Sequence, residues 1–424
     1  FVFGFVGDSL RSQVVMGKDR ISQLPEELLL KILSSLATKT VIATSVLSKR
    51  WRSLWKLVPK LEFEYDENRS TAENIGRSLL LHKAPVLESL RLTGLCEDID
   101  VGLWAGISFA RNVREFVLQA SVSNLLPVRF PSSLFFCDTL QTLKLKNPPI
   151  EIHVPSPVSM KSLRTLHLDS VTYKDNTSLR NLLSGCPNLE ELLVHRGPPN
   201  CVMKFTIMVP SLKRLSIKDC TSRWKGGYVI NAPSLKYLQI ERLKGCVSCL
   251  IEDAPELVEA NIRNISNILG SLKSAKRLSL DVWPVTIDYY HAGAIFYQLV
   301  YLEMNTHKAG WWNLLTTMLN SSPKLQVLKQ KQDFSIDDVV GERWKRPGRV
   351  PECLLSQTFV WKKYDLRRGK GIMVAKYILR NASCLKKATF STRPIESNEK
   401  LEILNEMNGM VKASKSCHLD LVFE

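Results

Sequence analysis

The middle of the chain repeats one short hydrophobic pattern. From about residue 84 to residue 330, apolar residues recur as L-x-x-L-x-L, where L is any apolar residue, and successive occurrences start 18 to 27 residues apart. Alternation of this kind predicts a short strand with one buried face, and a roughly constant spacing predicts a solenoid whose units cover one another. The leading residues are Leu87, Val113, Leu140, Leu163, Leu189, Leu212, Leu235, Leu257, Ala275, Leu299 and Leu325.

Proline marks the start of many units. It stops a preceding helix and lacks the amide that an interior strand needs, so it belongs just before a strand. Six units have it two residues before the leading position: Pro85, Pro187, Pro210, Pro233, Pro255 and Pro323. Each unit is therefore predicted to be a strand with an irregular or helical return, as in leucine-rich repeats. An ordinary α/β domain is the alternative, but its strands would lack a common spacing.

The segment before the repeats, residues 19–61, has a helical pattern. Pro25 and two glutamates suit a first helical turn, and Thr38 or Thr40 can cap a second helix. A basic run, residues 48–52, leads into a third helix. About forty residues rarely hold a core alone, so this unit should pack on something else. Its apolar residues at helical spacing are Leu28, Leu29, Ile32, Leu33 and Leu36.

The C-terminal region, residues 342–424, mixes a strand pattern with a helix pattern. Residues 350–361 are predicted to form a strand, and residues 373–385 carry apolar side chains at helical spacing. The remaining divisions are an N-terminal extension, residues 1–18, expected to be disordered, a connecting segment, residues 62–83, and the repeat region, residues 84–341. Met16 resembles a natural start, so residues 1–15 are expected to be an added extension.

Composition narrows the class of protein. Hydrophobic residues make up 45% and charged residues 23%, which excludes a disordered chain. Ten cysteines in 424 residues indicate reduced thiols, in cytoplasm or nucleus. The N-terminal apolar stretch is too short for a signal peptide or a membrane span, so no membrane partner is expected. The net charge is +17.

Catalytic and metal-binding motifs are not found in the sequence. Cys246-x-x-Cys249 lacks a second ligand pair, and no HExxH, G-x-S-x-G or phosphate-binding loop occurs. We expect neither an enzyme nor a cofactor. Two stretches that begin at Trp344 and Trp361 mix aromatic and basic residues, as proteins that bind single-stranded nucleic acid do. We expect these aromatics to pack inward, and nucleic-acid binding is not predicted.

Two segments resemble known domains. The run Leu24-Pro25-x-x-Leu28-Leu29, continued by Val46-Leu47-Ser48-Lys49-Arg50-Trp51, resembles the F-box of plant F-box proteins, with departures at Ala37 and Thr40. The C-terminal order V-P-E-C-L, F-x-W and A-x-Y-I-L resembles the FBD domain, although basic residues stand where that family often has acidic ones. The resemblance is thus to plant F-box/leucine-rich-repeat/FBD proteins. It implies an α/β fold with a three-helix F-box, a curved solenoid of parallel strands and a small α+β FBD-like cap.

The same resemblance implies a function without chemistry of its own. The F-box would bind the Skp adaptor of a cullin-RING ubiquitin ligase, and the repeats would bind an unknown protein target. Holding the target close to an activated ubiquitin carrier would speed its modification. By analogy, the adaptor-binding residues are Leu24, Pro25, Ile32, Leu33, Val46, Leu47, Trp51 and Trp55.

Target contacts are expected on the polar positions that alternate with the leucines. Among these, Lys144, Lys218 and Arg263 are the candidate target-binding residues. The alternative is a hormone or small-molecule receptor acting through the same ligase, which a deep apolar pocket rimmed by basic residues would favour. The C-terminal region should act mainly as the solenoid's end cap, or attract an acidic or phosphorylated segment through Arg367, Arg368 and Lys370.

Overall fold

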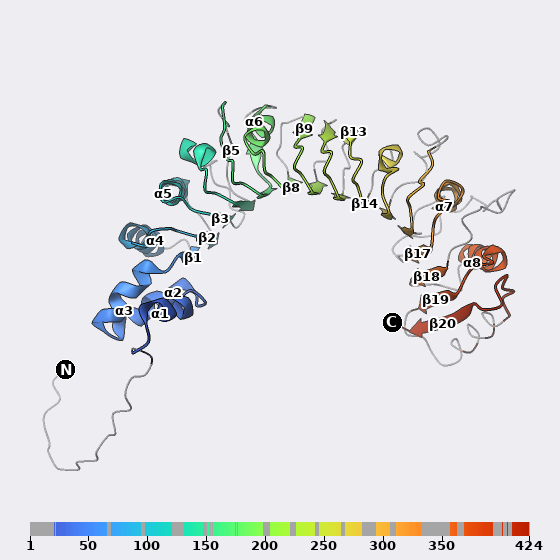
Figure 1. Ribbon diagram of the computed structural model, residues 1–424, viewed down its shortest axis with the longest axis horizontal. Coiled ribbons are helices and arrows are strands. Elements are labelled where there is room, and N and C mark those ends of the chain that lie inside the picture. The colour runs from blue at the N-terminus through green and yellow to red at the C-terminus, as the bar shows by residue number, and fades with distance from the viewer. Residues whose placement is uncertain are drawn as a thin grey trace, which may run out of the picture.

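A computed structural model describes most of the chain between residues 21 and 423. The described residues are 21, 23–65, 69–94, 98–120, 131–146, 151–152, 154, 156–173, 175, 177–197, 204–220, 226–241, 246–263, 268–281, 294–305, 311–331, 357–362, 369–392, 401, 405 and 409–423. These residues form a long arc with a helical unit at its N-terminal end (Figure 1). Strands follow the inner side of the arc, and helices lie on the outer side.

The helical unit is built from short helices. It contains α1 (Glu26–Leu33), α2 (Thr38–Ala43) and α3 (Lys49–Leu54), with the single turns η1 (Thr44–Val46) and η2 (Trp55–Leu57). The expected cap of α2 is not made: Ala37 holds the cap position, and the Thr38 hydroxyl instead accepts a hydrogen bond from the Glu62 amide at 2.7 Å. Ser48 caps α3 by accepting from the amide of Trp51.

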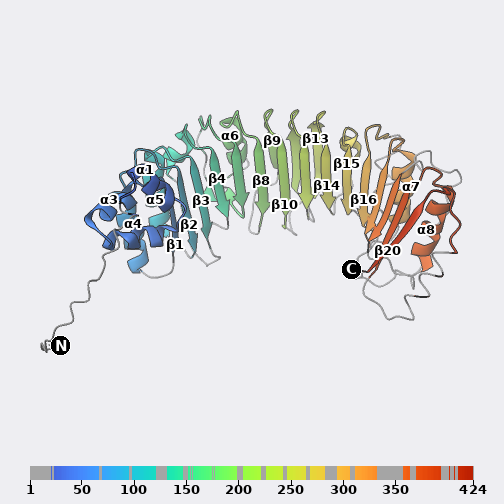
Figure 2. The same cartoon turned by 60° about the horizontal axis from the view of Figure 1, so that its bottom comes forward.

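One continuous sheet of 15 parallel strands forms the concave side of the arc (Figure 2). Each strand pairs in register with the next, so equivalent residues of successive repeats form rows across the sheet. In order, the strands are β1 (Lys60–Tyr65), β2 (Ser89–Gly94), β3 (Glu115–Ala120), β4 (Thr142–Lys146), β6 (Thr165–Asp169), β8 (Glu191–Arg196), β10 (Arg214–Asp219), β12 (Tyr237–Glu241), β14 (Glu259–Arg263), β15 (Arg277–Asp281), β16 (Tyr301–Asn305), β17 (Val327–Lys331), β18 (Thr358–Lys362), β19 (Lys387–Thr392) and β20 (His418–Phe423).

The repeat pattern predicted from the sequence is confirmed strand by strand. Every predicted leading residue is at most 2% exposed, and a strand begins two residues after each of them. The alternation of inward and outward side chains follows from the pleat of each strand. The predicted α/β solenoid of parallel strands is therefore the observed fold.

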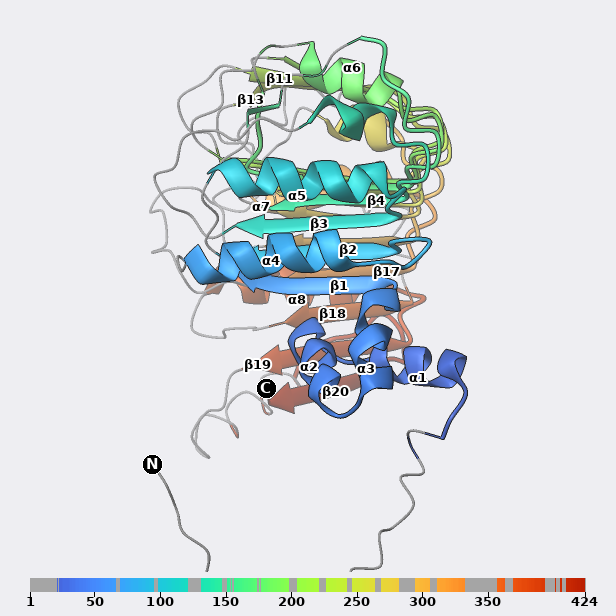
Figure 3. The same cartoon turned by 90° about the vertical axis from the view of Figure 1, so that its left-hand side faces the viewer.

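The convex side changes character along the arc. Its helices are α4 (Arg69–Leu81), α5 (Asp98–Ala110), α6 (Ser178–Ser184), α7 (Trp311–Asn320) and α8 (Gly369–Asn381), with the turns η3 (Ser132–Phe136) and η4 (Leu269–Leu272). Figure 3 shows α4 and α5 running alongside the first strands. In the middle the returns are strands instead, which differs from the irregular or helical returns expected from the sequence. They form a two-stranded sheet, β5 (Glu151–Ile152) and β7 (Thr172–Tyr173), and a three-stranded parallel sheet, β9 (Lys204–Met208), β11 (Gly226–Asn231) and β13 (Cys246–Asp253).

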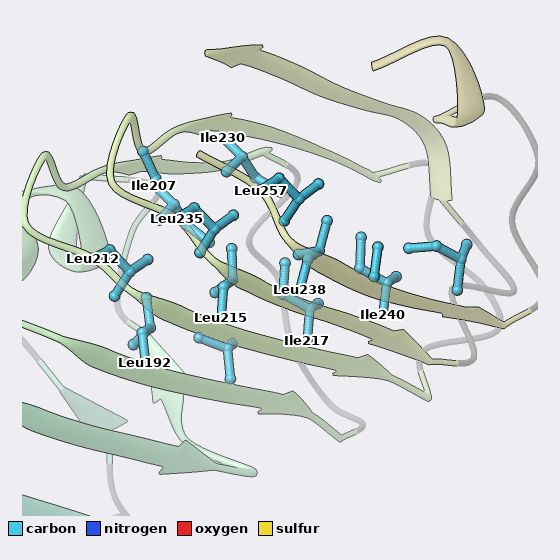
Figure 4. Packing of buried hydrophobic residues seen from close by; sticks show 14 of the residues in the cluster. Leu192, Ile207, Leu212, Leu215, Ile217, Ile230, Leu235, Leu238, Ile240 and Leu257 are labelled. Carbon is cyan, nitrogen blue, oxygen red and sulfur yellow. The ribbon is translucent and has the colours of Figure 1, made fainter. Parts of the chain in front are cut away.

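The core lies between the concave sheet and the convex elements. Leu215 and Ile217 of β10 point toward Ile207 and Ile230 of the second sheet, and each side chain is at most 2% exposed (Figure 4). Burying a side chain of this size stabilises the folded state by about 1.5–3 kcal/mol. Each repeat therefore depends on its neighbours for its apolar contacts.

A charged cluster lies inside this core. The Arg196 guanidinium is 2.8 Å from the Asp219 carboxylate, and the Tyr228 hydroxyl donates to the same carboxylate at 2.8 Å. The guanidinium also stacks on the Phe205 ring, 4.2 Å from its centroid. Burial raises the pKa of the Tyr228 hydroxyl, so it stays a donor at neutral pH. The cluster links β8 and β10 of the concave sheet to β9 and β11 of the second sheet.

The two ends of the solenoid differ in detail from the expected divisions. The segment expected to connect the F-box to the repeats contributes β1 and α4, so the first repeat begins at residue 60. At the other end, β18, β19 and β20 continue the parallel sheet instead of forming a sheet of their own. Helix α8 begins at Gly369 and ends at Asn381, earlier than the helix expected over 373–385. The predicted strand residues 350–356 lie outside the described residues.

Candidate functional site

The apolar residues of the helical unit divide into an interior set and a surface set. Of the predicted adaptor-binding residues, Leu33, Trp51 and Trp55 are at most 7% exposed and form the unit's own core with Leu29 and Leu54. Leu24 is half-buried and packs against this core. These four predicted side chains thus hold the helices together.

The surface set forms a second group. Pro25, Ile32, Val46 and Leu47 are exposed, and the last two are 84% and 64% exposed. Leu28 and Leu36 are exposed as well, although they were not predicted from the sequence as adaptor contacts. Leu28 and Ile32 are four residues apart on α1 and therefore share one face. We call Pro25, Leu28, Ile32, Leu36, Val46 and Leu47 the apolar docking surface.

The helical unit is fixed to the solenoid by hydrogen bonds. The amides of Lys83 and Ala84 donate to the Lys56 carbonyl at 2.7 and 3.0 Å, and the Glu88 amide donates to the Pro59 carbonyl at 2.8 Å. Thr38 adds its contact with Glu62. These bonds connect the end of the helical unit to the first two repeats, so the docking surface is held in a defined position relative to the concave sheet.

A buried histidine completes this joint. His82 has its Nε2 atom 2.8 Å from the Val58 carbonyl and its Nδ1 atom 2.7 Å from an Arg111 nitrogen. Arginine can only donate, so Nδ1 is the acceptor and Nε2 carries the proton. Burial lowers the pKa of His82, and the neighbouring Arg111 charge lowers it further. The hydrogen bonds of this joint therefore fit the neutral form of the His82 imidazole.

The outward positions of the strands line the concave face as predicted. None of the side chains predicted there is buried. The structure does not gather Lys144, Lys218 and Arg263 into one cluster: they lie on β4, β10 and β14. The guanidinium of Arg263 is 3.5 Å from the Glu241 carboxylate. The predicted outward residues are Arg91, Thr93, Lys144, Lys146, His167, Asp169, Ser216, Lys218, Gln239, Glu241, Asn261, Arg263, Ser279, Asp281, Glu303 and Asn305.

A further row of outward residues was not predicted from the sequence. Its members occupy the second x of each L-x-x-L-x-L, which the alternation also turns outward. Arg214 stacks on Tyr237 with the guanidinium 4.0 Å from the ring centroid, and Arg277 stacks on Tyr301 at 4.1 Å. The Tyr301 hydroxyl donates to Glu303 at 2.7 Å. Because these residues come first in their strands, we call this row the first outward row. Tyrosine and arginine dominate the energetics of many protein interfaces, so this row is a strong candidate for target contact.

Several other residues singled out from the sequence take no part in a site. Trp361 is 1% exposed and packs edge-on against Trp311 and Phe359, so it packs inward as expected and offers no face to a nucleobase. Arg367 and Arg368 lie outside the described residues, as do Trp344 and the side chain of Lys370. Within the described part of the chain, no group of three His, Cys, Asp or Glu side chains could hold a metal ion, and no helix is long and apolar enough to cross a membrane.

Comparisons with family models agree with the architecture. The F-box domain model matches residues 21–63, the model for the LRR repeats of FBD-associated F-box protein At5g56370 matches residues 101–261, and the FBD model matches residues 346–390. Among solved structures, a Leptospira interrogans LRR protein, LIC12759, is 15% identical, covers 93% of this chain and 98% of its own, and has a TM-score of 0.33.

Curated relatives match along the whole length. F-box/FBD/LRR-repeat protein At3g52680 of Arabidopsis thaliana is 54% identical over 99% of this chain and 96% of its own length. Two more from the same plant, At4g00160 and At3g51530, are 52% and 54% identical over 99% of this chain, covering 97% and 96% of their own lengths. With its F-box helices, repeat solenoid and FBD strands in one order, the chain belongs to the family of F-box/FBD/LRR-repeat proteins.

Proposed function

We propose that this protein is a substrate-recognition subunit of an SCF-type ubiquitin ligase, acting in the cytoplasm or nucleus. F-box proteins generally serve as substrate adaptors, and an F-box generally binds a Skp-family protein. In this proposal the apolar docking surface binds the Skp adaptor, which connects to the cullin and RING subunits. The concave face then binds a protein target.

The observation that carries the adaptor role is the exposure of large apolar side chains on a very small unit. Val46, Leu47, Leu28, Ile32 and Leu36 face solvent although the unit also has a filled core of its own. So many large apolar side chains exposed on so small a unit mark an interaction site, because their exposure to water is unfavourable unless a partner covers them.

The concave face supports direct protein recognition. Most of its outward residues are polar or charged, with tyrosine and arginine pairs in the first outward row. Anchors of this kind fit a protein surface, whereas a hormone receptor needs a mainly apolar pocket. At the end of strands β6, β8 and β10, His195 Nδ1 is 2.6 Å from the Asp169 carboxylate and His195 Nε2 is 3.6 Å from Cys220 Sγ. The family points to a non-catalytic subunit.

Adaptor binding is tested by changing the docking surface while leaving the core intact. The double variant Ile32→Asp/Val46→Asp should lose co-purification with a plant Skp adaptor, because a carboxylate would be buried in an apolar interface. The matched control is Leu80→Asp/Leu103→Asp, which alters two exposed leucines of α4 and α5.

The control should retain the adaptor, and both variants should keep the wild-type helical content. Equal recovery of the adaptor with the Ile32/Val46 variant and with the wild type would contradict the assignment. Loss with both variants would assign the effect to general damage and would also contradict it.

A further inference from the structure

Three side chains at the carboxyl ends of neighbouring strands form a hydrogen-bonded series on the concave face. Asp169 is the last residue of β6, His195 is the last but one of β8, and Cys220 directly follows β10, in the middle of the arc (Figure 2). The His195 Nδ1 atom is 2.6 Å from the Asp169 carboxylate, and its Nε2 atom is 3.6 Å from the Cys220 Sγ atom. All three residues are partly exposed. We call Asp169, His195 and Cys220 the cysteine triad.

The strand register explains why these side chains meet. Asp169 and His195 are in-register partners, and the alternation along their strands turns both to the concave face. Asp219, at the end of β10, is buried, so the next residue, Cys220, turns outward again. The Cys220 amide donates to the Arg196 carbonyl at 3.0 Å, which holds the thiol diagonally opposite His195.

The two contacts of the imidazole determine where its proton lies. A carboxylate can only accept, so the Nδ1 atom of His195 carries the proton and donates to Asp169. The Nε2 lone pair then faces the Cys220 thiol, which is the donor of this contact. The Ser170 hydroxyl donates to the same Asp169 oxygen at 2.9 Å, and the Ser170 amide donates to the His195 carbonyl at 2.8 Å. Ser170 therefore holds both the carboxylate and the strand that carries the histidine.

A thiol, a base and an orienting carboxylate in this order form an activated nucleophile. The imidazole can take the thiol proton, and the carboxylate stabilises the charge that then forms on the ring. Cys186 shows the contrast, because burial raises the pKa of its thiol to about 12 and keeps that thiol protonated. In the part of the chain that the structure describes, no three His, Cys, Asp or Glu side chains are placed to hold a metal ion, so the triad fits proton transfer and not metal ligation.

We propose that Cys220 is a nucleophilic thiol that forms covalent adducts with α,β-unsaturated carbonyl compounds. His195 takes the thiol proton while the sulfur attacks the β-carbon, so the carbon–sulfur bond forms and the carbon–carbon double bond opens to an enolate. The proton on His195 then returns to the α-carbon. The product is a thioether, and the step needs neither an oxidant nor a reductant.

This class of electrophile fits the groups that the triad supplies. The addition requires only a thiol and one base that can return its proton, whereas acyl transfer would also require hydrogen-bond donors for an oxyanion. The reactivity of the thiol does not rest on the proposed function. Its consequence for target binding does: Lys218, a candidate target-binding residue, is the in-register neighbour of His195, so an adduct on Cys220 would occupy the same part of the concave face.

The test measures the rates at which methyl vinyl ketone labels individual cysteines of the full-length protein. Mass spectrometry of proteolytic peptides reports Cys220 and the exposed Cys384 in the same sample. The variants are His195→Gln and Asp169→Asn. The matched control is His167→Gln, which removes another partly exposed histidine of the same sheet that also pairs with a carboxylate, at 3.1 Å.

We expect Cys220 of the wild type to react at least about tenfold faster than Cys384, although Cys220 is the less exposed of the two. His195→Gln should slow Cys220 at least about tenfold because the base is lost, and Asp169→Asn should slow it because the ring loses its orientation. Cys384 should react at the wild-type rate in every variant, and the control should leave both rates unchanged.

Three results would overturn the proposal. They are a wild-type Cys220 that reacts no faster than Cys384, an equal effect of His195→Gln and the control on Cys220, and an unchanged Cys220 rate in Asp169→Asn. Faster labelling of both cysteines in one variant would indicate that this variant unfolds, and the comparison within the wild type together with the other variant then decides.

Discussion

At the scale of single residues, the buried Arg196 cluster is the most demanding feature. Its guanidinium and the Asp219 carboxylate are both nearly inaccessible to water, with side chains 2% and 6% exposed. A buried charge is tolerated only while its partner remains. If the partner is removed, no water can reach the remaining charge to replace the lost contact. The cluster therefore makes the middle of the solenoid depend on one ion pair.

Asp219→Ala should destabilise the protein by about 3–5 kcal/mol, because it leaves the Arg196 charge buried with one partner fewer. The midpoint of urea unfolding, followed by circular dichroism, measures the effect. Asp253→Ala, at an exposed position of β13, is the control and should change the stability by at most about 0.5 kcal/mol. Adding Arg196→Met to Asp219→Ala should recover part of the loss. Similar midpoints for Asp219→Ala and the control would contradict this account.

Single residues also mark the limit of prediction from the sequence. In α1, Leu28, Leu29, Ile32 and Leu33 are all apolar, so their pattern does not say which pair faces inward. Packing decides it: Leu29 and Leu33 are buried, whereas Leu28 and Ile32 are exposed. His82 could not be assigned either, because its partners Val58 and Arg111 come from positions 24 and 29 residues away.

At the scale of elements, the joint between the helical unit and the first repeats carries a testable pH dependence. Burial holds the pKa of His82 below its usual value of 6.5 in the folded protein, while the unfolded chain binds a proton near that value. The unfolded state therefore takes up more protons as the pH falls through 6.5. Stability is highest above this pH and decreases as the pH falls toward the folded-state pKa.

His82→Gln should weaken this dependence, because an amide can occupy the same place without titrating. Thermal unfolding between about pH 7.5 and 5, the range in which histidine charge changes, should show a smaller decrease in midpoint for the variant than for the wild type. His167, whose pKa is also lowered mainly by burial, should keep part of the dependence in both proteins. Identical slopes would show that His82 does not contribute.

The concave strands of the repeats, β2 to β17, could be predicted from the sequence, whereas β1, β19, β20 and the second sheet could not. Every strand of the repeats shows the same alternation after a leading apolar residue, and this pattern has a single structural solution. The segments 226–231 and 246–253 are short apolar runs without that regularity, which suit a buried helix turn or a strand equally well. The pairing of β9 with β11 and of β11 with β13 comes from the stacking of the repeats, which no single segment encodes.

At the scale of the whole molecule, the two proposed binding functions occupy separate parts of one arc. The docking surface lies before β1, whereas Lys144, the first of the three candidate target-binding residues, lies on the fourth strand of the sheet. Changes at distant sites without shared contacts act independently. Target capture and adaptor binding should therefore be separable by substitution.

Lys144→Glu/Lys218→Glu/Arg263→Glu should reduce the proteins captured by affinity purification under blocked degradation, because reversed charges oppose a complementary partner. Adaptor recovery should stay at the wild-type level. Charge reversal at Lys204, Lys273 and Lys324 is the matched control and should leave both unchanged. Parallel loss of the adaptor and the captured proteins would indicate misfolding and would contradict a direct role of these residues.

The unbroken strand pairing of the concave sheet has a mechanical consequence. The arc has no hinge among its paired strands, so bending is shared among all strand interfaces, and each repeat contacts only its neighbours. A rotation of about one degree at each interface, small beside the roughly 20° twist between ordinary strands, adds up to more than about ten degrees between the ends. We expect the arc to bend slightly and elastically along its whole length. In the proposed function, this thermal bending would vary the distance between adaptor and target, and would bring different lysines of one target within reach of the ubiquitin carrier.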